Sequence, residues 1–448
     1  MTVPDSSLWW VRRDMRLADN PAAASAAESR NHAAIMCWTP GVHFWSGRRV
    51  AHLARVAWQL REAMGGALSV RRGEPAQVVT EAARQADASV VWAAQEFSPS
   101  GVATQDAVRT ALEADGRELR FVGSPYAVAP GRVRKSDGDP YKVFTPFRES
   151  WRAHGWRSPA PALDGHGWDR LSASDQDVDL DQMAAHGDTT DPLLAPHEFR
   201  EERVLADFGS FVDDALDRYQ SERDRPDLDS TSHLSTALAF GQIHPRTVLA
   251  AAARHDHPSA RIFESELAWR EFHADVLFHH PGARRESLTP VLSNQDWVAG
   301  TKADAAFMAW RDGLTGFPMV DAGMRQLAQT GWMHNRVRMV VASFLVKDLR
   351  VPWQRGADHF RRALVDYDHA QNQLNWQWVA GTGRDAAPFF RIFNPESQRD
   401  KFDPQRRYVE RWIPELDTPG YPTPMLDHKA ERAVTLEMYQ RAKAQRSR

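Results

Sequence analysis

The sequence contains only one cysteine, Cys37, among its 448 residues. Disulfides within the chain and cysteine-rich metal sites are therefore excluded, and a reducing cytoplasm suits the composition. No run of about 18 apolar residues is present, so we predict no membrane-spanning helix. The first residues lack a basic segment followed by a long apolar core, and we expect no signal peptide.

Several common catalytic signatures are also absent. The sequence has no Walker loop, no GxSxG, no GxGxxG after the first predicted strand and no zinc-ligand spacing among its histidines. The usual routes to hydrolysis or nicotinamide chemistry are thus unsupported, and we predict no metal site. The net charge of −3 argues against a protein that coats nucleic acid over its whole surface. A local basic face remains compatible with that charge.

Tyrosine is scarce, with 7 residues, whereas tryptophan is abundant, with 17. Tryptophan is poorly suited to filling space in a core, because its indole N–H needs a hydrogen-bond partner when it is buried. The excess indicates a use for indole rings beyond packing.

Short β-rich runs alternate with amphipathic helical patterns in the first third of the chain. The runs lie at residues 8–11, 33–38, 67–71, 88–92 and 119–122. This alternation predicts a doubly wound, Rossmann-like parallel sheet in an α/β domain over residues 1–130. Residues 131–198 are rich in Pro, Gly and acidic residues and predict a long surface linker. Residues 199–448 show helical periodicity and predict an all-α domain.

Residues 231–235 (TSHLS) open one of the predicted helices. Three hydroxyls beside the free N–H groups of a first helical turn could cradle a phosphate or pyrophosphate. A plain Ser/Thr helix cap explains the same residues, and the segment alone does not decide between the two.

Two further helices carry polar side chains on one face. In residues 265–273, Glu266, Trp269 and Arg270 share a face with His273. In residues 331–340, Asn335, Arg338 and Met339 lie together. An arginine that enters a buried helix usually has an acidic partner. The indole on the first face favours binding over a solvated ion-pair face.

Residues 365–380 (VDYDHAQNQLNWQWVA) are the most informative segment. As a helix, they align Asp368, Asn372 and Trp376 at i, i+4 and i+8. Such a stripe, leading into Trp-rich apolar sequence, fits an internal hydrogen-bond network or, better, a ligand with donors and acceptors along one edge. An isoalloxazine ring has such an edge.

These segments resemble the cryptochrome/photolyase family, and in particular microbial class I cyclobutane pyrimidine dimer photolyases. The resemblance covers nearly the whole chain, including WWVRRDMRLADNPA, PYKVFTPFRESW, TSHLS, ELAWREF, TGFPMVDAGMRQLAQTGWMHNRVRMVVASFLVKDL and WQWVAGTGRDAAPFFRIFNPESQRDKFDP. It implies an α/β antenna domain joined to a helical, FAD-binding catalytic domain. The implied activity is light-driven splitting of pyrimidine dimers in damaged DNA, by a cytoplasmic protein that we expect to act as a monomer.

The resemblance assigns roles by position. Non-covalent FAD would be held by Tyr219, Thr231, Ser232, His233, Leu234, Ser235, Asn335, Arg338, Asp366, Tyr367, Asp368 and Asn372, with Arg338 paired to Asp366. Asn372 matches the residue beside flavin N5. Trp376, Trp353 and Trp297 match the three tryptophans that pass electrons inward from the surface.

At the lesion, Glu266 matches the acid that binds the damaged bases, Trp269 and Trp378 match two indoles against the flipped dimer, and Met339 matches a further contact. Base extrusion by photolyases is a known case of nucleotide flipping. Arg223, Arg270 and Arg391 would meet DNA phosphates.

The sequence also departs from the family pattern. His233 replaces a frequent Arg, Phe263 stands where many members have Trp, and the spacer around Asn372 is altered. The interval from Trp297 to Trp310 is about three residues longer than usual, which bears on the outer relay residue. Residues 98–101 lack the Asn-Glu pair of folate-binding members. An 8-hydroxy-5-deazaflavin antenna is therefore favoured over methenyltetrahydrofolate, and an empty antenna site stays open.

Three other functions compete with dimer repair. A cryptochrome-type light receptor is the first alternative, and Asn372 together with the intact lesion residues argues against it. Repair of (6-4) photoproducts would call for histidines at the lesion face. A generic flavin electron-transfer protein would leave Arg270 and Arg391 unexplained.

Overall fold

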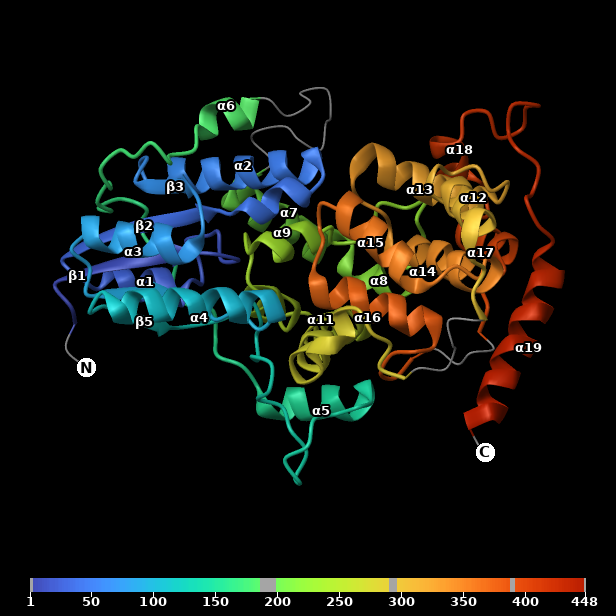
Figure 1. Cartoon of the computed structure of the whole chain (residues 1–448), viewed down its shortest axis with the longest axis horizontal. Helices are drawn as coiled ribbons and strands as arrows, with labels where there is room; N and C mark the ends of the chain where they lie inside the picture. Colours follow the sequence, from blue (N-terminus) through green and yellow to red (C-terminus); the bar gives the residue numbers. More distant parts are fainter. Residues whose placement is uncertain (1–2, 186–198, 290–295, 387–390, 447–448) are drawn as a thin grey trace. The chain divides into compact units, whose positions relative to one another are not determined.

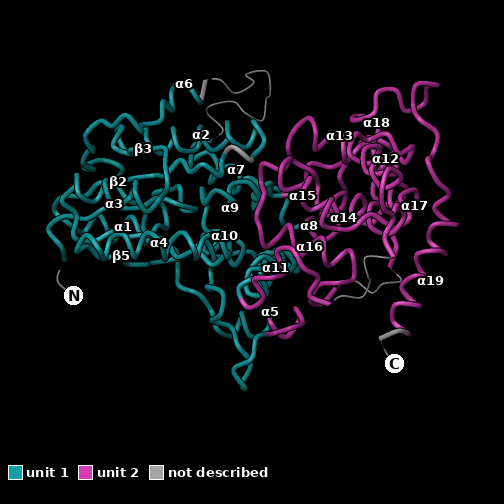
Figure 2. Tube along the Cα trace, viewed as in Figure 1, with its two compact units in different colours: residues 1–140, 148–217, 232–278 teal, residues 141–147, 218–231, 279–448 magenta. Residues whose placement is uncertain are grey.

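The computed structural model describes residues 3–185, 199–289, 296–386 and 391–446. By its internal contacts the chain forms two compact units, coloured separately in Figure 2. Unit 1 comprises residues 1–140, 148–217 and 232–278, and unit 2 comprises residues 141–147, 218–231 and 279–448. Unit 1 thus includes helices beyond residue 198 as well as the sheet. The expected domain boundaries near residues 130 and 198 stay a prediction.

Unit 1 contains the predicted parallel sheet. Its strands are β1 (Ser6–Val11), β2 (Asn31–Trp38), β3 (Leu68–Arg72), β4 (Val90–Ala93) and β5 (Glu118–Phe121). The spatial order is β3-β2-β1-β4-β5 and every pairing is parallel, with Leu8 opposite Ala33 and Val91. The direction of travel across the sheet reverses between β1 and β4, which is the doubly wound arrangement. The α/β fold class is confirmed.

Four helices connect these strands: α1 (Pro21–Ala27), α2 (Gly47–Ala63), α3 (Pro75–Gln85) and α4 (Pro99–Ala114). Right-handed crossovers place α1 and α2 on one face and α3 and α4 on the other. Figure 1 shows α3 beside α4 along the sheet. Alternate strand residues such as Trp10, Ile35 and Val91 pack with Val79 and Val108 in one apolar cluster under these two helices. This burial of both sheet faces explains why the strands read as near-continuous apolar runs.

The rest of unit 1 is helical. It contains α6 (Leu180–Ala185), α7 (Glu201–Asp214), α9 (Ser235–Phe240), α10 (Pro245–Ala252), α11 (Pro258–His279) up to residue 278, most of α5 (Phe144–His154), and the 3₁₀ turns η1 (Pro40–Phe44) and η4 (Leu216–Arg218) up to residue 217. The segment predicted as a surface linker, residues 131–198, also contributes to the core, because Trp151 and Trp168 within it are buried. Asp169 and Asp177 also form isolated β-bridges with Ala33 and Arg71.

Unit 2 is a helical bundle, as predicted for the C-terminal part of the chain. It contains α8 (Tyr219–Glu222), α12 (Gly300–Arg311), α13 (Pro318–Thr330), α14 (Asn335–Ser343), α15 (Trp353–Ala363), α16 (His369–Ala380), α17 (Pro395–Phe402), α18 (Arg407–Trp412), α19 (His428–Arg446), the 3₁₀ turn η5 (Pro281–Arg284) and the π-helical turn η7 (Phe344–Asp348). Its apolar core is formed by residues of α13, α14 and η7 together with Trp310, Trp353 and Trp376. In the described ranges, no helix is long and apolar enough to cross a membrane.

Candidate functional site

Helix α16 carries the predicted polar stripe, but it begins four residues later than the pattern suggested. Asp368 has extended backbone angles and caps the helix, because its carboxylate accepts a hydrogen bond from the N–H of Gln371 at 3.1 Å. Asn372 and Trp376 follow inside the helix, and both are buried. Tyr367, just before the cap, makes a 2.6 Å hydrogen bond between its hydroxyl and Nδ1 of His369.

The Asn372 amide is oriented by unit 2 itself. Its Nδ2 donates to the carbonyl of Ala357 and to Oε1 of Gln373, each at 3.0 Å. Both N–H groups are thus engaged, and the amide oxygen remains as the acceptor. An Asn held in this way presents an acceptor to a ligand N–H.

The predicted ion pair between Arg338 and Asp366 is present. Arg338 Nη2 lies 2.7 Å from Asp366 Oδ2, and Arg338 Nε donates to the carbonyl of Met333 at 2.7 Å. The Asp366 side chain is 1% exposed and the Arg338 side chain 24%. Oδ1 of Asp366 is buried and has no partner among the described residues. A buried carboxylate oxygen without a donor is costly, so this atom indicates a ligand that donates to it.

Two predicted relay tryptophans belong to the core of unit 2. Trp353 is 1% exposed, and its indole N–H donates to the Ser287 hydroxyl at 3.1 Å. The Trp376 ring meets Trp310 and Phe360 edge-on, with centroids 6.2 and 5.1 Å away. Trp297 is half-buried against the same core. All three lie in unit 2, two of them buried in its apolar core and Trp297 packed against that core.

Sequence reasoning missed Gln377, which lies between two predicted site tryptophans, Trp376 and Trp378. It is fully buried, its Nε2 donates to the carbonyls of Ala283 and Glu286, and its Oε1 accepts from the N–H of Leu288. These bonds fix the turn that carries the hydrogen-bond partner of Trp353. A glutamine between two tryptophans was visible in the sequence, but its burial and its distant partners were not.

The TSHLS segment is divided between the units, with Thr231 in unit 2 and Ser232 onward in unit 1. Leu234 is the residue before α9, no side-chain bond caps that helix, and His233 has a positive φ of 49°. The plain Ser/Thr cap is therefore not what the structure has. Upstream in unit 2, Tyr219 is buried and the Arg223 guanidinium lies 5.4 Å from its ring centroid.

Helix α11 in unit 1 places Glu266 and Trp269 in half-buried positions. Arg270, which was expected to meet a DNA phosphate, is 8% exposed. Its guanidinium donates to the carbonyls of Pro125 at 2.8 Å and Leu238 at 3.4 Å and lies over the Tyr126 ring. The guanidinium thus lies among protein acceptors in this structure, and its contact with a DNA phosphate stays a prediction.

Glu271, the next residue, was not predicted. Its carboxylate accepts hydrogen bonds from the backbone N–H groups of Ala127 and Val128 and from the indole of Trp151. Burial raises the pKa of Glu271 to about 7, against the opposing effect of these three donors. Together with Asp275, which accepts from the N–H of Gly131 at 2.6 Å, this side chain fastens residues 127–131 to α11.

The remaining predicted residues lie in unit 2 with mixed exposure. Asn335 is exposed at the start of α14, Met339 is half-buried one turn later, and Trp378 is half-buried on α16. Arg391 is exposed, and among the described residues its guanidinium has no hydrogen-bond or ion-pair partner. It is therefore available to an external anion.

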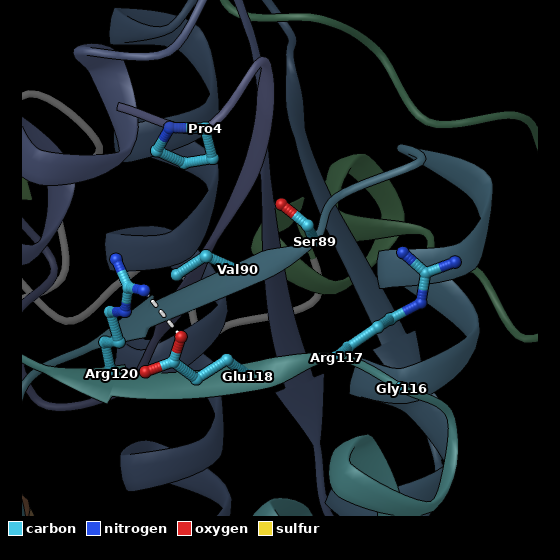
Figure 3. Close-up of a pocket in the computed structure, with 7 residues that line it drawn as sticks. All are labelled: Pro4, Ser89, Val90, Gly116, Arg117, Glu118 and Arg120. Carbon is cyan, nitrogen blue, oxygen red and sulfur yellow. Dashed lines mark hydrogen bonds and ion pairs between the residues drawn. The ribbon is translucent and has the colours of Figure 1, made fainter. Parts of the chain in front are cut away.

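No cluster of metal-ligating side chains occurs in the parts of the chain that the structure describes. A cavity of 420 Å³ lies at the start of strands β4 and β5, lined by Pro4, Ser89, Val90, Gly116, Arg117, Glu118 and Arg120. Figure 3 shows these lining residues. Arg120 and Glu118 pair with each other there at 2.6 Å. None of the predicted site residues lines this cavity. Ligands of such sheets bind at the opposite, carboxyl ends of the strands, so we assign it no role.

Comparison with known proteins gives a consistent result. Residues 7–164 match the model described as DNA photolyase, and residues 263–419 match the FAD binding domain of DNA photolyase. The deoxyribodipyrimidine photo-lyase of Halobacterium salinarum is 36% identical, over 97% of this chain and 99% of that protein.

Two solved structures have the same fold. A bacterial class III photolyase from Agrobacterium tumefaciens has a TM-score of 0.88 and 32% identity, with 99% of each chain covered. A cryptochrome from Synechocystis sp. PCC6803 has a TM-score of 0.84 and 25% identity, with 98% and 100% covered. Assignment to class I therefore stays a prediction. With identity above 30% along nearly the entire chain, this chain belongs to the photolyase/cryptochrome family.

Proposed function

We propose that this chain repairs cyclobutane pyrimidine dimers in DNA with blue light and non-covalent FAD. The observation that carries the proposal is a pair of buried polar side chains in unit 2. Asp366 Oδ1 lacks a donor among the described residues, and Asn372 offers its amide oxygen. An isoalloxazine edge, which has N–H donors and carbonyl acceptors, complements these groups and Arg338. When bound, FAD supplies the light-excited electron donor for splitting the dimer.

The residues proposed to hold the cofactor keep their predicted roles. Asn335, Arg338, Asp366, Asp368 and Asn372 would line the flavin ring. The remaining predicted contacts are Tyr219, Thr231, Ser232, His233, Leu234, Ser235 and Tyr367. No cysteine lies in this set. A histidine attachment is unsupported too, so FAD should be released by denaturation.

The electron supply would run through Trp297, Trp353 and Trp376, with Trp376 nearest the flavin. The burial of Trp353 and Trp376 in the apolar core of unit 2 supports this role, because indoles inside the bundle can lie between the surface and a bound flavin. The relay feeds the cofactor and takes no part in binding the lesion.

The lesion would meet Glu266, Trp269, Met339 and Trp378. Indole walls suit the two linked rings of a flipped dimer, with stacking worth about 1–3 kcal/mol per base. Glu266 would bind the carbonyl and imide edges of the dimer. Met339 would fill the remaining space with a flexible side chain that has no proton to donate. Arg223, Arg270 and Arg391 would contact phosphates, although Arg270 is buried among protein acceptors in this structure.

We further propose an antenna chromophore in the α/β unit, at the carboxyl ends of β1 and β4 where the sheet reverses direction. Arg12 there donates to Gln105 and to the carbonyl of Gly101. Glu96 is 4% exposed, and its Oε1 has no partner among the described residues. An 8-hydroxy-5-deazaflavin remains favoured over a folate.

The proposal is tested with the purified protein. Its absorption spectrum should show a flavin that acid precipitation releases. Under blue light the reduced protein should restore a dimer-containing oligonucleotide, with no repair in the dark. A colourless protein that gains no flavin on incubation with FAD, or a flavoprotein that repairs nothing, would refute it. The second outcome would favour the cryptochrome-type receptor.

A further inference from the structure

Lys347 is a buried cation that neither the family resemblance nor the proposed chemistry uses. It lies in the π-helical turn η7 and is 1% exposed. Its Nζ donates to the backbone carbonyl of Arg391 at 2.7 Å, and it forms no ion pair with a carboxylate in the described parts of the chain. Burial lowers the pKa of Lys347 to about 8, opposed by Asp348 and reinforced by Arg391. A buried ammonium without a paired anion does not stabilise a fold, so this lysine needs another explanation.

Its hydrogen bond is one of two that hold the same stretch of backbone. One turn earlier, the hydroxyl of Ser343 accepts from the N–H of Phe393 at 3.3 Å, and Ser343 is itself fully buried. The backbone at residues 391 and 393 is thus fastened to one short helical segment. The Arg391 side chain, by contrast, is exposed.

The C-terminal helix α19 fixes the π-helical turn. The hydroxyl of Thr435 donates to the carbonyl of Lys347 at 2.5 Å, and His428 Nδ1 lies 2.5 Å from Asp348 Oδ1. Arg350, just after the turn, pairs with Glu431. The lysine therefore lies on a segment that α19 contacts at residues 347, 348 and 350.

We propose that Lys347 is a positioning residue for DNA binding, which holds the backbone at Arg391 so that the Arg391 guanidinium meets a phosphate of the DNA. This inference rests on the proposed function of Arg391. A guanidinium binds phosphate through a planar, directional fork, so its affinity depends on how firmly the backbone beneath it is held. Direct attraction between Lys347 and DNA is not required, because the ammonium is covered.

The test compares Lys347→Met with Arg391→Ala, the double variant and the control Lys429→Met, which removes an equal charge from an exposed position on α19. Affinity for dimer-containing and intact duplexes is measured on the holoprotein from about 50 to 200 mM salt. Lys347→Met should lower the affinity for both duplexes about three- to tenfold. It should also reduce the slope of log affinity against log salt concentration by up to about one. Lys429→Met should leave the slope close to wild type.

Two readouts separate positioning from a general structural role. Lys347→Met should keep the FAD content and keep or raise the urea midpoint, since it replaces an unpaired buried charge with an apolar side chain. Added to Arg391→Ala, it should cause little further loss of affinity. A wild-type salt slope in Lys347→Met, or fully additive losses in the double variant, would overturn the proposal.

Failure of the proposed contact can be recognised separately. If Arg391→Ala binds DNA like the wild type, Lys347 has nothing to position and the inference falls, whereas light-driven repair by the wild type would still support the proposed function. If Lys347→Met does not fold, Ser343→Ala removes the neighbouring attachment without changing charge. It must then lower affinity in the same direction, and an unchanged affinity would overturn the inference.

Discussion

Removing Arg338 should destabilise unit 2 more than neutralising its partner Asp366, because the two side chains are unequally buried. The Asp366 side chain is 1% exposed, and the Arg338 side chain is 24% exposed. Arg338→Ala leaves a buried carboxylate with neither oxygen paired, a change that costs about 3–5 kcal/mol for a fully buried pair. Partial exposure of the arginine reduces this, and we expect the free energy of unfolding to fall by about 3 kcal/mol. Asp366→Asn leaves an arginine that water can reach, and should cost about 1 kcal/mol.

The assay is urea unfolding of the flavin-free protein, followed by tryptophan fluorescence, because bound FAD would stabilise each variant by a different amount. The double variant Arg338→Ala/Asp366→Asn completes a thermodynamic cycle, in which we expect a coupling of about 2 kcal/mol. Equal losses in the two single variants, or a coupling below about 0.5 kcal/mol, would refute the reasoning from burial.

Three further predictions concern other parts of the molecule. Trp376→Phe should nearly abolish photoreduction of bound FAD while chemically pre-reduced protein still repairs DNA, and unchanged photoreduction in a flash-absorption experiment would exclude the relay. The stability due to Glu271 should be present below pH 4.5 and decline by about 3 kcal/mol as pH rises to about 7, because its pKa is raised on folding and the folded state binds more protons in that window. Glu271→Gln should remove this pH dependence in urea titrations and lower stability at pH 5, since its amide N–H must face an N–H donor. Trp269→Ala should reduce the preference for dimer-containing over intact DNA in a binding competition, whereas an unchanged ratio would remove Trp269 from the lesion contacts.

The strands could be predicted because local pattern and tertiary environment agree. Each predicted run overlaps its strand and differs from it by no more than two residues at either end, as at β4, expected over 88–92 and found over Val90–Ala93. Helix α16 began later than expected because Asp368 prefers to cap a helix, and periodicity alone does not register that preference.

The environment of single charged residues could not be predicted in the same way. Arg270 sits on a helix face that reads as a binding surface, yet its partner Pro125 is 145 residues away in the sequence. Lys347 and Glu271 likewise form hydrogen bonds with residues far away in the sequence, Arg391 and Trp151. Residue type and spacing do not encode such long-range contacts, so these three positions needed the structure.

The ion pair between Arg338 and Asp366, by contrast, could be predicted from residue type together with the family resemblance. An arginine that enters an apolar helix needs an anion, and the family resemblance named the segment that supplies it. The outer end of the tryptophan relay was not predictable, since the longer interval after Trp297 shifts the register that the resemblance relies on.

The central claim is repair of cyclobutane dimers, and a paired lesion assay tests it most directly. Two oligonucleotides of the same sequence, one with a cyclobutane dimer and one with a (6-4) photoproduct, are incubated with the reduced protein under blue light and in the dark. We predict restoration of the dimer substrate in the light, with none in the dark and none of the (6-4) substrate. Repair of the (6-4) substrate alone, or of neither, would contradict the account.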